Sequence, residues 1–93
     1  MIEQTMPGGW SPVATDETAV KKAAENAVSL QAKKTGESLK LLSIKKAKQQ
    51  VVAGVNYELI LEINRNGQET TAMVIVWRKL DGSYQVTEWW WKS

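Results

Sequence analysis

Residues 50–67 read QVVAGVNYELILEINRNG, and this stretch decides the fold. After Gly54 the apolar residues alternate with polar ones, which is the period of a half-buried β-strand. The alternating apolar residues are Val55, Tyr57, Leu59, Leu61 and Ile63. Asn66 and Gly67 then form the strongest short hairpin signal, because both residues tolerate the positive φ of a type I′ turn. The stretch therefore predicts one strand between two hairpin turns.

Strand patterns continue on both sides of this stretch. Upstream, residues 39–52 read as a long strand in which the alternation slips, which indicates a bulge. Downstream, residues 69–79 are apolar on both faces, a pattern typical of a central strand that is covered on both sides. A tight turn at residues 80–83 leads into a last strand over residues 84–91. The pattern predicts four antiparallel strands joined by three hairpins.

A helix is predicted before these strands. Its apolar residues repeat at spacings of three and four, and they are Ala19, Val20, Ala23, Ala24, Ala27, Val28 and Leu30. Thr15 and Asp16 offer N-cap oxygens, and Gly36 can take the left-handed conformation that ends a helix. We expect about five turns with a face of small residues that suits close packing on a curved sheet.

The predicted fold is therefore α+β, with one long helix packed across a four- to five-stranded antiparallel sheet. A short extended piece is expected at residues 10–14. Alternate turns of a meander lie at the same end, so the first and third hairpins share an edge. The chain before the helix can reach that end too. Spacing alone thus brings Gly8-Gly9, Val52-Ala53 and Leu80-Asp81 to one edge.

Composition narrows the range of functions. The 93 residues are 43% apolar and 24% charged, which predicts one small folded domain. The net charge of +2 provides no strong field for nucleic acid or a membrane. The chain has no cysteine and no histidine, which excludes Ser-His and Cys-His nucleophiles and thiolate or imidazole metal ligands. We expect no enzyme, no cofactor and no metal site.

The glycine pair Gly8-Gly9 and the run Gln50-Val51-Val52-Ala53-Gly54 together resemble the cystatin family of reversible papain-like cysteine peptidase inhibitors. The likeness is closest to its intracellular, disulfide-free stefin branch. The resemblance implies a single cystatin-like domain over residues 1–93, with residues 1–9 as a flexible trunk. It further implies a wedge that fills the active-site cleft of a papain or cathepsin-type peptidase and presents no cleavable peptide bond.

Carried over residue by residue, the wedge consists of the trunk, the first hairpin and the second hairpin. The resemblance implies that these residues bind the peptidase: Pro7, Gly8, Gly9, Gln50, Val51, Val52, Ala53, Gly54, Leu80 and Asp81. The second hairpin departs from the Pro-Trp pattern of secreted and plant cystatins. Its Leu80-Asp81 pair is nearer to the leucine-bearing loop of stefins.

Other functions stay open at this point. A cystatin-like scaffold could serve as a non-inhibitory binding module, either engineered or built to bind single-stranded nucleic acid through Trp89, Trp90 and Lys45 to Lys48. The N-terminus lacks the pattern of a secretory signal, so a cytoplasmic location is expected unless a leader was removed. We expect a monomer, with the long first hairpin as a candidate hinge for a domain-swapped dimer.

Overall fold

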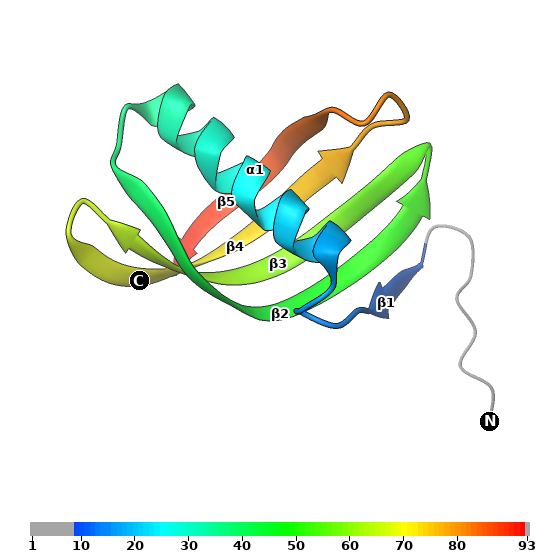
Figure 1. Cartoon of the computed structure of the whole chain (residues 1–93), viewed down its shortest axis with the longest axis horizontal. Helices are drawn as coiled ribbons and strands as arrows, with labels where there is room; N and C mark the ends of the chain where they lie inside the picture. Colours follow the sequence, from blue (N-terminus) through cyan, green and yellow to red (C-terminus); the bar gives the residue numbers. More distant parts are fainter. Residues whose placement is uncertain (1–8, 93) are drawn as a thin grey trace.

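The computed structural model describes residues 9–92. The elements are β1 (Trp10–Pro12), α1 (Thr18–Thr35), β2 (Leu39–Val52), β3 (Gly54–Arg65), β4 (Gln68–Arg78) and β5 (Tyr84–Lys92). The five strands form one antiparallel sheet in the order β1-β2-β3-β4-β5, and α1 crosses one face of that sheet (Figure 1). The predicted α+β fold is confirmed, and β1 supplies the fifth strand.

The core lies between α1 and the sheet, and the alternation in β3 places its residues. Tyr57, Leu59, Leu61 and Ile63 are buried, as predicted from their spacing. They meet buried residues of the helix and of the neighbouring strands, which are Val20, Ala23, Ala24, Ala27, Val28, Ala47, Ala72, Val74 and Val76. The helix contributes only valine and alanine to this core, and such small side chains allow close approach to the sheet.

The helix ends as predicted but begins later than predicted. Gly36 has φ 76°, and its N–H donates to the Ala32 carbonyl at 2.8 Å. The N-cap is Glu17, without a side-chain capping bond, so the expectation that Thr15 or Asp16 caps the helix is wrong. The physical reason is the backbone hydrogen bond from Val13 to Ala47, which extends the pairing of β1 with β2. A turn must follow before the chain can cross to the helix.

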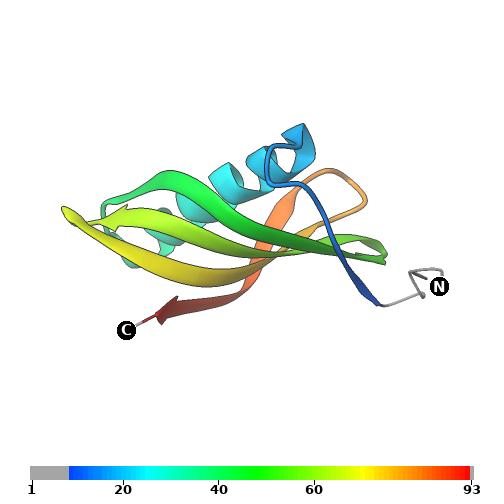
Figure 2. The ribbon, with the colours of Figure 1, turned by 90° about the horizontal axis from the view of Figure 1, so that it is seen from below.

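Within residues 9–92, the sheet carries a helical layer on one face only. Figure 2 shows α1 on one side of the sheet and no element on the other. Ala72, Val74 and Val76 of β4 are buried beneath the helix, whereas Met73, Ile75 and Trp77 are half-buried on the open face. The expectation that β4 is covered on both faces is therefore wrong. Neighbouring side chains shield the open-face residues instead, since Met73 lies between Ile60 and Trp90 in the strand register.

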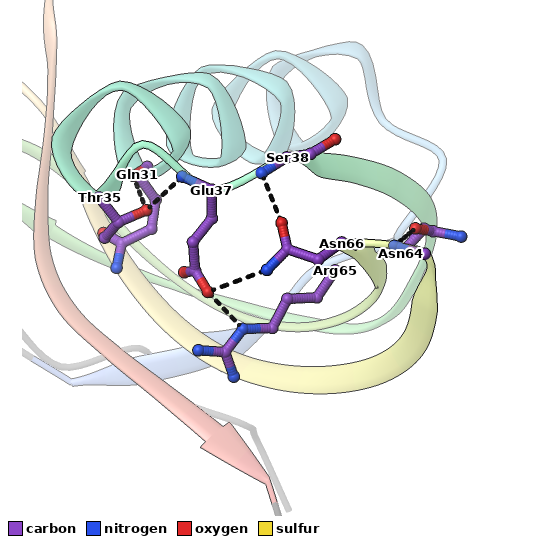
Figure 3. Close-up of polar contacts among 8 residues, drawn as sticks. Gln31, Thr35, Glu37, Ser38, Asn64, Arg65 and Asn66 are labelled. Atoms are coloured by element: carbon purple, nitrogen blue, oxygen red, sulfur yellow. Dashed lines mark hydrogen bonds and ion pairs between the residues drawn. The ribbon is translucent and has the colours of Figure 1, made fainter.

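A polar cluster closes the end of the molecule where β3 turns into β4. Asn66 exchanges two hydrogen bonds with Ser38. Its backbone N–H donates to the Ser38 carbonyl at 2.8 Å. Its Oδ1 accepts from the Ser38 N–H at 2.9 Å, the bond that Figure 3 draws. Arg65 donates to Glu37 at 2.7 Å and lies 4.2 Å from the ring centre of Trp91. These contacts tie the α1–β2 connection to the predicted Asn66-Gly67 turn.

β2 is irregular, as predicted. Its pairing with β3 shifts between Leu41 and Ser43 and again between Ile44 and Lys46. These irregularities lie in the half of β2 nearer the polar cluster. From Lys46 to Val52 the pairing is continuous, so the hairpin at the opposite end is a regular extension of two strands.

Candidate functional site

The first hairpin exposes apolar side chains at its tip. Val52 pairs with Gly54, which leaves Ala53 alone at the turn, and Val51 pairs with Val55. Val51 and Val52 are 57% and 40% exposed. A valine side chain exposed at the tip of a tight turn is unfavourable because its apolar surface contacts water, and it adds no packing to the core. This tip is therefore a candidate for contact with another molecule.

Gly54 allows the tip to lie against the end of β4. Its φ is 95°, a conformation that residues with a side chain rarely adopt. A Cβ at this position would collide with the backbone oxygen of Arg78. The glycine of the predicted motif is thus required twice, once by the turn and once by the close approach of β4.

The chain before the helix reaches the same hairpin. Trp10 in β1 pairs directly with Gln50 in β2, so Gly9 lies beside the first predicted residue of the hairpin. The Asn56 side-chain amide donates to Gln50 Oε1 at 2.9 Å. This bond links the two strands of the hairpin below its tip. Pro7 and Gly8, the other predicted trunk residues, lie outside the described residues.

The second hairpin is a compact turn with a leucine at its apex. The Lys79 N–H donates to the Ser83 carbonyl at 2.8 Å, and the Gly82 N–H donates to the Lys79 carbonyl at 2.9 Å. Asp81 Oδ1 accepts from the Ser83 hydroxyl at 2.7 Å and from its N–H at 2.9 Å. These bonds hold the pKa of Asp81 below its ordinary value. The turn leaves Leu80 82% exposed.

The two hairpins converge on one end of the molecule. Figure 1 shows both turns, and β1 beside them, at the end opposite the polar cluster. A shallow groove of about 400 Å³ runs between the hairpins, lined by Ala53, Trp77, Lys79, Leu80 and Asp81. The structure therefore brings together every predicted site residue that lies within residues 9–92.

Two residues of this edge were not predicted. Trp77 forms the wall of the groove, and Lys79 lies beside it with Nζ 5.5 Å from the centre of the Trp77 ring. The signal was present in the sequence, because Trp77 alternates with the apolar core residues of β4 and lies near the end of that strand. A bulky aromatic residue at the outward end of a central strand has to find a partner outside the core.

The cystatin domain, as a sequence family, matches residues 8–86 of this chain. The chain belongs to the cystatin family. L-cystatin of Tachypleus tridentatus is 42% identical over 59 residues, which is 61% of this chain. That match covers 44% of the length of the relative. Inhibition of cysteine peptidases, and not catalysis, is the function that this family indicates in general.

Solved cystatin structures share the fold. The salivary cystatin of the soft tick Ornithodoros moubata superimposes with a TM-score of 0.79 at 22% identity, over 95% of this chain and all of its own. Mialostatin, a gut cystatin of the hard tick Ixodes ricinus, superimposes with a TM-score of 0.78 at 19% identity, over 91% of this chain and 98% of its own. These likenesses establish the fold of the cystatin domain. The assignments to the stefin branch and to the cytoplasm stay predictions.

The tryptophans at the end of β5 do not form one stacking platform. Trp89 and Trp91 lie on the helix side, edge to face with ring centres 5.3 Å apart, whereas Trp90 lies on the open face and is 60% exposed. Trp90 Nε1 donates to Glu88, a carboxylate that would repel a phosphate backbone. This arrangement disfavours the nucleic-acid alternative.

Two further properties concern residues 9–92 only. Within this range no helix combines the length and the apolar character needed to cross a membrane. The same range holds no group of three or more acidic, histidine or cysteine side chains placed to bind a metal ion.

Proposed function

We propose that this cystatin is a reversible, competitive inhibitor of papain-like cysteine peptidases. The trunk and the two hairpins enter the active-site cleft as one wedge and block access to the catalytic cysteine. One observation carries the proposal: two hairpin tips with exposed apolar side chains lie together at the end of the sheet where Gly9 and Trp10 begin the described chain.

The geometry of the first hairpin suits an inhibitor and not a substrate. A peptide that is cleaved lies extended in the cleft, whereas Ala53 lies at the apex of a tight turn next to Gly54 with φ 95°. The continuous pairing of β2 with β3 up to Val52 and Gly54 orders both arms of the hairpin before any partner binds. The hairpin thus offers an ordered apolar surface without the extended backbone that cleavage requires.

The shape of the edge also fits tight binding. Protein inhibitors of peptidases bury about 1,600 Å² in total with their targets. Such a surface gives high affinity when its loops are ordered beforehand, because ordering them on binding would reduce the free energy of association. Strand pairing orders the first hairpin, and the hydrogen bonds of Asp81 and Ser83 order the second.

The direct test is a titration of papain and of a cathepsin with the purified protein. Competitive, stoichiometric inhibition is expected. Undiminished activity of both enzymes at micromolar concentrations of the protein would end the proposal.

Val52→Asp tests the role of the first hairpin. A charge at this position would be desolvated in the complex without a partner, at a cost of roughly 2 kcal/mol or more. That cost corresponds to at least about 30-fold weaker inhibition, measured as the inhibition constant. Leu42→Asp is the matched control, because Leu42 is 44% exposed on the same strand but lies near its opposite end. Equal inhibition constants for the two variants would place the contact elsewhere.

A further inference from the structure

Trp77 connects the two hairpins. It lies on the open face of the sheet as the last residue but one of β4, directly before Arg78. Its indole Nε1–H donates to the carbonyl oxygen of Ala53, at the tip of the first hairpin, over 2.8 Å. On the other side, the ammonium group of Lys79 lies 5.5 Å from the centre of its ring. The indole therefore contacts residues of both hairpins.

This hydrogen bond acts at the one point of the first hairpin that strand pairing leaves unsupported. Ladder pairing reaches Val52 and Gly54 but not Ala53 between them. The missing side chain of Gly54 lets the tip approach the Arg78 carbonyl, yet absence of a clash does not hold the tip there. The Trp77 N–H supplies the attraction, because its acceptor is the carbonyl of the apical residue itself.

We propose that Trp77 is a positioning residue that locks the tip of the first hairpin onto the base of the second. The two hairpins then meet a partner as one rigid edge, with the groove between them held at a fixed width. This inference rests on the proposed inhibitory function. Trp77 need not touch the peptidase to act. Its hydrogen bond orders the tip when the protein folds. Ordering the tip therefore does not reduce the free energy of binding.

Trp77→Phe isolates the hydrogen bond. Phenylalanine keeps an aromatic ring beside Lys79 and removes only the indole N–H and part of the ring. The Ala53 carbonyl is at an exposed position, so water replaces the missing donor. The melting temperature is therefore expected to stay within roughly 4 °C of that of the parent protein.

Trp89→Phe is the matched control. The Trp89 Nε1 atom is buried and has no hydrogen-bond partner among residues 9–92. The same exchange of tryptophan for phenylalanine therefore removes no hydrogen bond there. Trp89 also lies on the helix side of β5, away from the groove between the hairpins.

Two measurements decide the proposal. In the free protein, amide hydrogen exchange at residues 52–54 is expected to be roughly 3- to 10-fold faster in Trp77→Phe, the range for loss of one such bond, and unchanged in Trp89→Phe. Against papain, Trp77→Phe is expected to dissociate faster by a similar factor with little change in association rate. Both effects together support the positioning role.

Either effect missing from Trp77→Phe, or present equally in Trp89→Phe, overturns it. The exchange measurement uses no peptidase, so it stands even if the parent protein fails to inhibit papain. In that case the proposed function fails while the connection between the hairpins is still tested. If the parent inhibits and Trp77→Phe matches it in both measurements, only the positioning role is wrong.

Discussion

At the scale of single residues, Gly54 meets two constraints, one set by its own turn and one set by the neighbouring strand β4. Gly54 could be assigned to a turn because glycine among apolar residues between two strands needs an unusual backbone. Its second constraint, the Arg78 carbonyl, comes from the far end of β4 and has no local signature in the sequence. The partner of Trp77 was hidden for the same reason.

Gly54→Ala separates the two constraints when it is compared with Gly82→Ala. Both glycines have positive φ, at 95° and 88°, but an added Cβ meets nothing within 4 Å at Gly82. Backbone strain alone should destabilise Gly82→Ala by about 1–2 kcal/mol. Gly54→Ala should lose more stability, because the tip must also move away from β4, and it should also inhibit papain more weakly than Gly82→Ala. Chemical denaturation measures the loss of stability, and titration of papain measures the loss of inhibition. Equal losses in the two variants would contradict the close approach.

At the scale of elements, sequence periodicity predicted the features that each element sets by itself. It failed for features that depend on contacts with other elements. The alternation of β3 fixed its buried face because side-chain period is a property of the strand itself. The start of α1 was misplaced because the Val13–Ala47 backbone bond delays it. The cover of β4 was misjudged because an apolar strand can lie in a sheet with only one helical layer.

Leu59→Ala and Leu80→Ala test the division between core and edge. Leu59 is fully buried in β3, so its truncation should lower the free energy of unfolding by about 2–5 kcal/mol. Leu80 is 82% exposed, so its truncation should change stability by no more than about 0.5 kcal/mol. Inhibition should respond in Leu80→Ala, by roughly tenfold for a central apolar contact. Thermal unfolding and papain titration distinguish them. A stability loss in Leu80→Ala would contradict the exposed position of this leucine. Unchanged inhibition would show that Leu80 makes no contact with the peptidase.

At the scale of the whole molecule, the alternation of turns in a meander was enough to predict which ends meet. The two hairpins lie at one end, and the polar cluster of Glu37, Arg65 and Asn66 lies at the other (Figure 1 and Figure 3). The family match adds that this arrangement is that of cystatins. Which peptidase fits the edge depends on side-chain contacts across an interface, and those are not encoded in periodicity.

Removal of residues 1–8 tests the contribution of the trunk. All buried core residues of the described chain lie between positions 20 and 76, so thermal stability should be unchanged. The shortened inhibitor should bind papain more weakly, chiefly through faster dissociation, because a smaller interface between the same two proteins acts mainly on that rate. Stopped-flow and displacement measurements give the two rates. A dissociation rate equal to that of the full chain would show that the trunk makes no contact.

The central claim is tested most directly by the amide chemical shifts of the isotopically labelled protein. They are recorded with and without papain whose catalytic cysteine carries a small blocking group that leaves the cleft open. The predicted result is a joint change at residues 9–10, 50–54 and 80–82, with none at residues 36–38 or 64–67 at the opposite end. Changes centred on the opposite end, or on Trp90 and the open face of the sheet, with the two hairpins unaffected, would contradict the wedge.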